Sequence, residues 1–144
     1  MSDLPYELVI ECDGSSLKGQ GAGAGFVASD GYSEAIPLPK DSTNNEAEYH
    51  AVIGALKYLA RHPADITFAK ILSDSELVVK QINGDYKVKN SRLQKLHKVA
   101  HTQIQKIGLT LGHHIVFSHI PREENTRADG ISRVAALLSM AEIP

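Results

Sequence analysis

The stretch "NNEAEYHAVIGALKYLARH", residues 44–62, decides how the rest of the sequence is interpreted. Its apolar residues recur at the spacing of one face of an α-helix, and Thr43 and Glu46 are spaced as a capping box at its start. Glu48 falls in register with three residues of that apolar face, Val52, Ala55 and Leu59. A buried carboxylate without a partner is costly, so Glu48 is either wrongly assigned to this face, paired, or bound to a metal.

The segments on either side of this helix predict an α/β fold. Three short strands come first, at residues 6–14, 21–31 and 32–38, and Asp30-Gly31 is a strong hairpin signal between the last two. We expect the first strand to end in a turn at Asp13-Gly14. The rest of the chain predicts a strand at residues 66–74, two helices at 75–84 and 91–108, a strand at 113–120 and a last helix at 123–142. This order favours a mixed sheet with helices packed on it.

The composition limits the kind of protein. With 144 residues, 42% of them hydrophobic, we expect a single domain over residues 1–144. The formal net charge of −2 argues against binding of nucleic acid by bulk charge, but it allows a local basic face. One cysteine excludes an internal disulfide, and no apolar run is long enough to span a bilayer. We therefore expect a cytoplasmic monomer with no membrane and no protein partner.

Acidic residues stand at the boundaries of four predicted elements, namely Asp13, Glu48, Asp74 and Asp129. Asp13-Gly14 is also typical of a turn, Asp74 of a helix cap and Asp129 of an acid near a helix N-terminus. Capping does not explain Glu48, because Thr43 already caps its helix. Two carboxylates 4 Å apart repel by roughly 4 kcal/mol at an effective dielectric near 20, so a converging set requires cations. Ligands that are all oxygen atoms suit Mg²⁺ or Mn²⁺ better than Zn²⁺.

The order of four motifs along nearly the whole chain resembles type 1 ribonuclease H. The motifs are "ECDGSS" with the glycine-rich "GQGAGAGF" after it, "STNNEAEY", "ILSDSELVV" and "SHIPREENTRADGISR". The resemblance implies the ribonuclease H-like fold, a five-stranded mixed sheet with three antiparallel strands first, then parallel strands, and helices on both faces. It also implies that the four metal-binding carboxylates are Asp13, Glu48, Asp74 and Asp129.

The resemblance further implies a reaction. The family hydrolyses the RNA strand of RNA/DNA hybrids, leaving 5'-phosphate and 3'-hydroxyl ends, with two Mg²⁺ ions for which Mn²⁺ substitutes. Asp13, on the central strand, would bridge the two ions. His119, expected in the loop after the last strand, matches the family's mobile histidine, which acts in proton transfer or product departure. An ordinary surface histidine is the alternative interpretation.

Substrate contacts follow from the same resemblance and from the charge pattern. Asn44 and Asn45 match positions that contact the minor groove of the hybrid, although helix capping would also explain them. Between residues 80 and 106, seven Lys and Arg residues stand against one acid, a local excess of six positive charges. The predicted substrate-binding residues are Gly14, Ser15, Asn44, Asn45, Lys87 and Lys89. The stretch "GQGAGAG" is interpreted as mainly structural, with close approach to a phosphate chain as the alternative.

Some features leave other functions open. The chain runs from the short helix at 75–84 into the helix at 91–108 without the basic helical protrusion that some family members carry. A catalytically silent hybrid-binding module, a small-molecule phosphohydrolase and a retroelement-derived ribonuclease H domain remain alternatives. The ending "ADGISR" resembles the retroelement form, whereas Met1 and the short tail "MAEIP" favour a free-standing enzyme.

Overall fold

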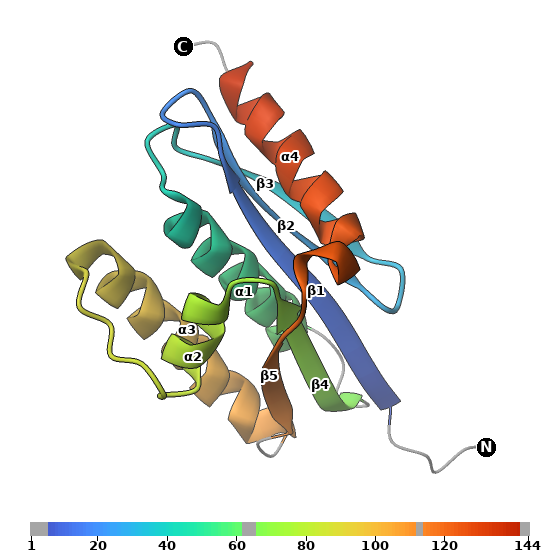
Figure 1. The fold of residues 1–144 in the computed structure, drawn as a ribbon. Coiled ribbons are helices and arrows are strands. Elements are labelled where there is room, and N and C mark those ends of the chain that lie inside the picture. The colour runs from blue at the N-terminus through green and yellow to red at the C-terminus, as the bar shows by residue number, and fades with distance from the viewer. Residues whose placement is uncertain (1–5, 62–65, 112–113, 142–144) are drawn as a thin grey trace.

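A computed structural model describes residues 6–61, 66–111 and 114–141 (Figure 1). The strands are β1 (Tyr6–Ser16), β2 (Ala22–Ala28), β3 (Ser33–Leu38), β4 (Ile66–Ser73) and β5 (Ile115–His119). The helices are α1 (Asn44–Ala60), α2 (Glu76–Ile82), α3 (Ser91–Leu111) and α4 (Thr126–Met140), with a 3₁₀-helix, η1 (Arg122–Glu124), before α4. None of the helices within the described ranges is both long and apolar enough to cross a membrane.

The sheet has five strands in the order β3-β2-β1-β4-β5. The pairs β1/β2 and β2/β3 are antiparallel, and the pairs β1/β4 and β4/β5 are parallel. The predicted mixed sheet is therefore confirmed, and β1 is its central strand. Alternate residues of β1, from Leu8 through Ile10 to Cys12, are completely buried.

The predicted turn at Asp13-Gly14 is wrong. β1 continues through both residues to Ser16, and Asp13 pairs with Gly25 of β2. The local preference of Asp-Gly for a turn is outweighed by ladder hydrogen bonds to β2, which satisfy the backbone of β1 over this stretch. Asp13 is consequently held inside a strand, where its backbone has little freedom.

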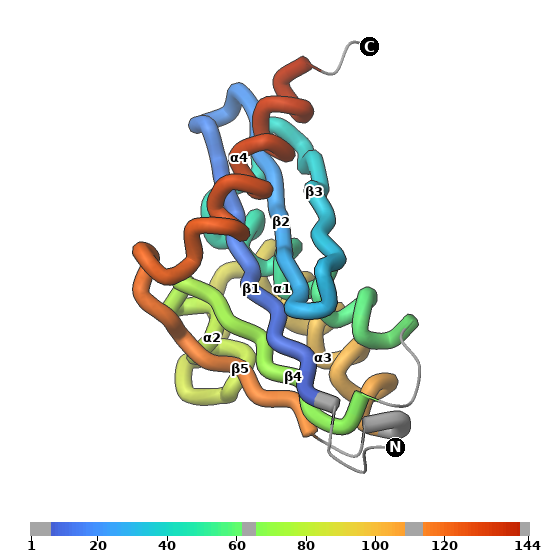
Figure 2. Tube along the Cα trace, turned by 90° about the vertical axis from the view of Figure 1, so that its right-hand side faces the viewer, coloured from blue at the N-terminus to red at the C-terminus, as the bar shows by residue number. Residues whose placement is uncertain are grey.

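Helices cover both faces of the sheet (Figures 1 and 2). α4 packs on one face, against β1, β2 and β3, while α1 packs on the opposite face, with α3 behind it. The glycines of β2 make the contact with α4 close. A Cβ at Gly23 would lie 2.3 Å from the backbone nitrogen of Ala136, and one at Gly25 would lie 2.9 Å from that of Ser132. The glycine-rich stretch therefore has the structural role that the sequence favoured.

The start of α1 is fixed by the predicted capping box. The Thr43 hydroxyl accepts the backbone N–H of Glu46 at 3.1 Å, and the Glu46 carboxylate accepts that of Thr43 at 2.9 Å. Asn44 and Asn45 were expected just before the helix, but they are its first two residues, so neither is the N-cap. Proline is typical of the end of a helix, so the sequence also predicts a stop at Pro63, which lies outside the described residues.

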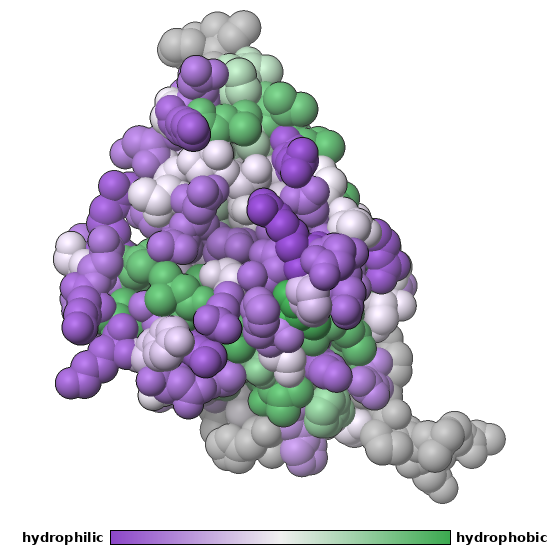
Figure 3. Space-filling model, in the orientation of Figure 1, coloured by the Kyte–Doolittle hydropathy of each residue, from purple (hydrophilic) through white to green (hydrophobic). Residues whose placement is uncertain are grey.

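No helix stands between α2 and α3, which are joined by residues 83–90. Most of these residues are exposed, and they form the outer loop at the left of Figure 1. Hydrophilic side chains cover this edge in Figure 3. The structure therefore matches the form of the family without the basic protrusion.

Candidate metal centre and active site

Three of the predicted carboxylates come together from three different elements. Asp13 lies on β1, Glu48 lies in the second turn of α1, and Asp74 directly follows β4. One carboxylate oxygen from each residue lies within 4.8 Å of the other two. The parallel pairing of β1 with β4 places Cys12 opposite Ser73, and Asp13 and Asp74 follow these two residues. Two neighbouring strands and one helix thus fix the cluster.

The three carboxylates lie close together and are buried or half-buried, which disfavours their charged forms. Burial is the main cause that raises the pKa of Asp13 to about 6; the hydrogen bond from Ser132 opposes this change, and the charges of Asp74 and Asp129 contribute to it. Burial likewise raises the pKa of Glu48 to about 10, and the charges of Asp13 and Asp74 add to this effect. In the metal-free protein, at least one proton therefore remains on the cluster at neutral pH.

Neighbouring groups hold two of the three carboxylates in place. Glu48 accepts a hydrogen bond from the backbone N–H of Gly14. A Cβ at Gly14 would lie 2.3 Å from the backbone nitrogen of Glu48, so only glycine allows α1 to approach β1 this closely. On the other side, the Ser132 hydroxyl of α4 donates to Oδ2 of Asp13 at 2.7 Å. Helices on both faces of the sheet thus orient the cluster.

The residues present fit a divalent metal ion. Oδ2 of Asp74 is buried and has no hydrogen-bond partner in the structure. A buried acceptor without a donor is costly unless a cation or water satisfies it. The ligand atoms that the cluster offers are all carboxylate oxygens, which suit Mg²⁺ or Mn²⁺. A divalent cation at this cluster would give the Glu48 carboxylate a second partner besides the backbone N–H of Gly14.

Asp129 lies outside this group of three. It is in the first turn of α4, is half-buried, and forms an ion pair with Arg133, whose Nε lies 3.1 Å from Asp129 Oδ2. Its charge still acts on Asp13, since it is one of the causes of the raised pKa of that carboxyl. Asp129 is therefore close enough to interact with the cluster but belongs to its periphery.

His119 is the last residue of β5 rather than part of the loop that follows, which corrects the predicted position. The strand pairing reaches His119 because the backbone N–H of Ile120 donates to the carbonyl of Ser73 at 2.9 Å. His119 pairs with Ser73, the residue before Asp74, and its side chain is exposed. This places an accessible imidazole at the strand end next to the cluster.

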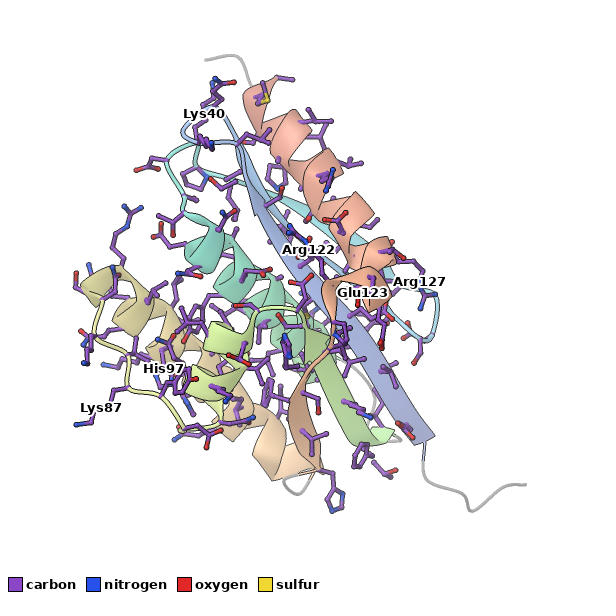
Figure 4. All side chains as sticks on the ribbon, viewed as in Figure 1. Lys40, Lys87, His97, Arg122, Glu123 and Arg127 are labelled. Carbon is purple, nitrogen blue, oxygen red and sulfur yellow. The ribbon has the colours of Figure 1, made fainter. Side chains whose placement is uncertain are left out.

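The other predicted substrate contacts fall into two places. Gly14, Ser15 and Asn44 lie beside the cluster, and Asn44 Oδ1 accepts the backbone N–H of Ser16 at 3.1 Å. Asn45 is exposed in the first turn of α1. The exposed Lys87 and Lys89 lie apart from these residues, in loop 83–90, and Figure 4 shows Lys87 directed away from the body of the protein.

The sequence interpretation missed three residues of the site. Arg122 lines a cavity of about 260 Å³ together with Asp13, Gly14, Asn44, Glu48 and Asp74, and Figure 4 places it over the centre of the sheet. Ser132 is buried against Asp13, and the buried Asn125 donates to the carbonyl of Cys12 at 2.7 Å. All three belong to the stretch "SHIPREENTRADGISR", from which only His119 and Asp129 were selected. Their positions depend on how the chain enters α4, which the spacing does not reveal.

Comparisons with known proteins agree with this geometry. The RNase H family model matches residues 5–136. Ribonuclease HI of Helicobacter pylori is 33% identical over 140 residues, covering 90% of this chain and 93% of that protein. The bifunctional protein Rv2228c of Mycobacterium tuberculosis is 35% identical over 135 residues, covering 90% of this chain but only 35% of its own length. The chain thus spans about a third of that relative.

Solved structures lead to the same family. The N-terminal RNase H domain of the same mycobacterial protein has a TM-score of 0.77 and 32% identity, covering 94% of this chain and 97% of that chain. LC11-RNase H1, isolated from compost, was solved in complex with an RNA/DNA hybrid. That complex has a TM-score of 0.77 and 31% identity, and it covers 92% of this chain and 99% of its own. The sheet order, the carboxylate cluster and these matches all agree. The chain belongs to the RNase H family.

Proposed function

We propose that this protein is a metal-dependent endoribonuclease that hydrolyses the RNA strand of RNA/DNA hybrids and leaves 5'-phosphate and 3'-hydroxyl ends. The observation that supports this most directly is the cluster of Asp13, Glu48 and Asp74 beside an open cavity, with Asp74 Oδ2 buried and unpartnered. The hybrid as substrate is supported by family membership and by the related LC11-RNase H1, whose structure contains one.

Different residues of the chain would have different roles in the reaction. Asp13, Glu48 and Asp74 would hold two Mg²⁺ ions together with Asp129 at the periphery. When bound, these ions would supply positive charge to the phosphodiester and lower the pKa of the attacking water. His119, accessible at the end of β5, would move a proton at the edge of the site. Arg122 would bring a fixed positive charge to the cavity wall.

Binding of the hybrid would use other surfaces. Asn44, at the cavity, has an amide that can contact the minor groove and its 2'-hydroxyl groups. Lys87 and Lys89 would contact phosphates, because they are exposed and lie within the locally basic span 80–106. These contacts do not depend on base identity, as expected for cleavage without sequence preference.

A silent binding module is less well supported. Clustered carboxylates repel a phosphodiester, so a protein that only bound nucleic acid would gain nothing from them. The raised pKa values show that the charged forms of these clustered carboxylates are disfavoured. Cations that enter the site would relieve this repulsion and reverse the charge that the phosphodiester meets.

The test is cleavage of a hybrid labelled on its RNA strand, with Mg²⁺ present, in parallel with single-stranded RNA, duplex RNA and duplex DNA. We expect cutting of the hybrid's RNA strand alone, loss of cutting with a chelator, and recovery with Mn²⁺. Analysis of the product ends by phosphatase and ligase treatment distinguishes 5'-phosphate from 3'-phosphate. Tight hybrid binding without any cutting would refute the proposal and leave the silent module.

A further inference from the structure

A cavity beside loop 83–90 contains two histidines that the proposed reaction does not use. It has a volume of about 430 Å³ and lies between the C-terminal end of α2, the loop and the N-terminal half of α3. His97 and His101 line it from successive turns of α3, and both are half-buried. Figure 4 shows His97 on this side of the molecule, together with Lys87 and well away from Arg122 of the carboxylate site.

Two imidazole nitrogens and one main-chain carbonyl oxygen meet at this point, and because a carbonyl oxygen only accepts, Nε2 of His97 donates its proton towards it in the metal-free protein. Nε2 of His97 lies 3.1 Å from Nε2 of His101, and it also lies 3.1 Å from the main-chain carbonyl oxygen of Gln81. That oxygen also accepts the N–H of Gly84 at 3.2 Å, so a metal ion would take the place of the proton on Nε2 of His97, and the neutral ring would carry its proton on Nδ1 instead. The imidazole planes are tilted by 59°, so the two rings are not stacked against each other.

The position of Gln81 is fixed by its own side chain. Its Oε1 accepts the buried hydroxyl of Tyr49 at 2.6 Å, and its Nε2 donates to the carbonyl of Lys87 at 3.4 Å. The carbonyl that faces His97 is therefore held by α1 and by loop 83–90 and does not move freely. The two histidines are held by one helix, so the three atoms are preorganised.

We propose that His97 and His101, with the Gln81 carbonyl, form a binding site for a transition-metal ion such as Ni²⁺, Zn²⁺ or Cu²⁺. For metal–nitrogen bonds of about 2.0–2.1 Å, neighbouring ligands are about 2.9 Å apart in an octahedron and about 3.3 Å apart in a tetrahedron. The observed separation of 3.1 Å lies between these two values. Water would complete the coordination from the open cavity.

This site would differ in chemistry from the carboxylate cluster. Imidazole nitrogen prefers Ni²⁺, Cu²⁺ and Zn²⁺, whereas the carboxylate oxygens of the cluster prefer Mg²⁺ and Mn²⁺. Burial and the neighbouring His97 lower the pKa of His101, which keeps its ring neutral and able to bind a metal at pH 7. A bound ion would connect α3 to the end of α2 and thereby stabilise the folded protein.

The experiment is calorimetric titration of the full chain with Ni²⁺ in a large excess of Mg²⁺, which occupies the carboxylate site. We expect one Ni²⁺ site and a rise in melting temperature that increases with Ni²⁺ concentration. His97→Ala and His101→Ala should each abolish both effects. The matched control is His114→Ala, which removes an exposed histidine from the sequence pair His113-His114 and should leave Ni²⁺ binding unchanged.

The spectrum of bound Cu²⁺ gives a second measurement that does not depend on stability. Electron paramagnetic resonance should show coupling to two imidazole nitrogens in the wild-type protein and in His114→Ala, and to fewer in His101→Ala. Ni²⁺ binding that survives in both His97→Ala and His101→Ala, or that disappears in His114→Ala, would overturn the proposal. So would a melting temperature that Ni²⁺ does not raise.

Discussion

Asp13 is held at its position by contacts from three directions. The ladder to β2 fixes its backbone, Ser132 donates to its carboxylate, and Asn125 holds the preceding residue, Cys12. The residue as a whole is only 4% exposed, and burial is the main cause that raises the pKa of its carboxyl to about 6. Such an environment disfavours the charged form in the absence of a cation, so this residue links the energetics of the fold to metal binding.

Asp13→Asn tests this assignment because it keeps the size and the hydrogen bond from Ser132 while removing the charge. We expect hybrid cleavage to fall by about a thousandfold or more, since several kcal/mol of transition-state stabilisation are removed. Hybrid binding, measured by fluorescence anisotropy, should be unchanged or tighter because a phosphate-repelling charge is gone. Cleavage near the wild-type rate in this variant would contradict the metal assignment.

His119→Ala should slow turnover without abolishing it. Its exposed position at the end of β5 suits proton transfer, whose contribution is typically at least about a hundredfold when the group acts directly. We expect kcat to fall by about a hundredfold, with KM nearly unchanged, in steady-state kinetics at pH 7. His114→Ala is the matched control and should behave as the wild type. A complete loss of activity in His119→Ala would show that its role is larger than proposed.

The sequence predicted some of these residues better than others. Glu48 could be identified because a carboxylate on an apolar helix face is unusual, and Asp74 because it directly follows an apolar strand. The turn predicted at Asp13-Gly14 was wrong, because dipeptide preference is a local property whereas strand pairing depends on distant residues. Arg122 and Ser132 could not be identified for the same reason, since η1 and α4 bring them to β1 from more than a hundred residues away.

At the scale of elements, the contact between β2 and α4 determines where the peripheral residues of the site lie. α4 carries both Ser132 and Asp129, and its backbone is in close contact with Gly23 and Gly25. Any side chain at these two strand positions would push the helix away from the sheet. The alternation of glycine in "GAGAG" is therefore a packing requirement for the site, although these glycines do not take part in the chemistry.

Gly23→Ala should reveal this requirement. The added methyl group would meet the backbone of α4 at 2.3 Å, and overpacking of this kind costs about 1–3 kcal/mol of unfolding free energy. Gly130→Ala is the control, because a Cβ there meets nothing within 4 Å and alanine favours a helix by about 0.5–1 kcal/mol. In urea denaturation, the unfolding free energy should thus be lower than that of the wild type for Gly23→Ala and higher for Gly130→Ala. Equal stability of both would contradict the packing argument.

Loop 83–90 is the element on which substrate grip is predicted to depend. Replacing both Lys87 and Lys89 with alanine should raise KM for the hybrid and leave kcat unchanged. The slope of log affinity against log salt should become shallower by about 0.7–0.9 for each phosphate that the variant no longer neutralises. Lys57→Ala is the control, since this exposed lysine lies near the other end of α1 from Glu48. An unchanged salt slope in the double variant would place the phosphate-binding residues elsewhere.

At the scale of the whole molecule, the architecture could be predicted because several independent signals agreed. Hairpin chemistry indicated the antiparallel strands, and alternating helix and strand patterns indicated the parallel ones. The limits of the elements were less certain. α3 extends to Leu111 instead of residue 108, and α4 begins at Thr126 after a separate turn, η1. Such boundaries depend on tertiary contacts, which outweigh local preference at the ends of elements.

The free energy of unfolding of the whole protein should depend on both pH and metal binding, because both act on the proton of Glu48. The pKa of Glu48 is raised to about 10 in the folded protein, so the folded state keeps a proton that the unfolded chain has released above about pH 4.5. Stability from this group is complete below that pH and is lost as the pH rises towards 10, by at most about 1.4 kcal/mol per pH unit.

The pH range from 7 to 8 isolates this effect. Burial lowers the pKa of His50 and His101, so both rings are neutral there, and burial raises the pKa of Cys12 far above its usual value, so its thiol stays protonated. We expect the melting temperature of the metal-free protein to fall from pH 7 to pH 8, and the increase caused by Mg²⁺ to be larger at pH 8. Glu48→Gln should remove both trends, because glutamine has no proton to release. If Mg²⁺ raised the melting temperature of the wild type equally at both pH values, no proton would leave the cluster when the metal binds. The raised pKa of Glu48 would then have no part in metal affinity.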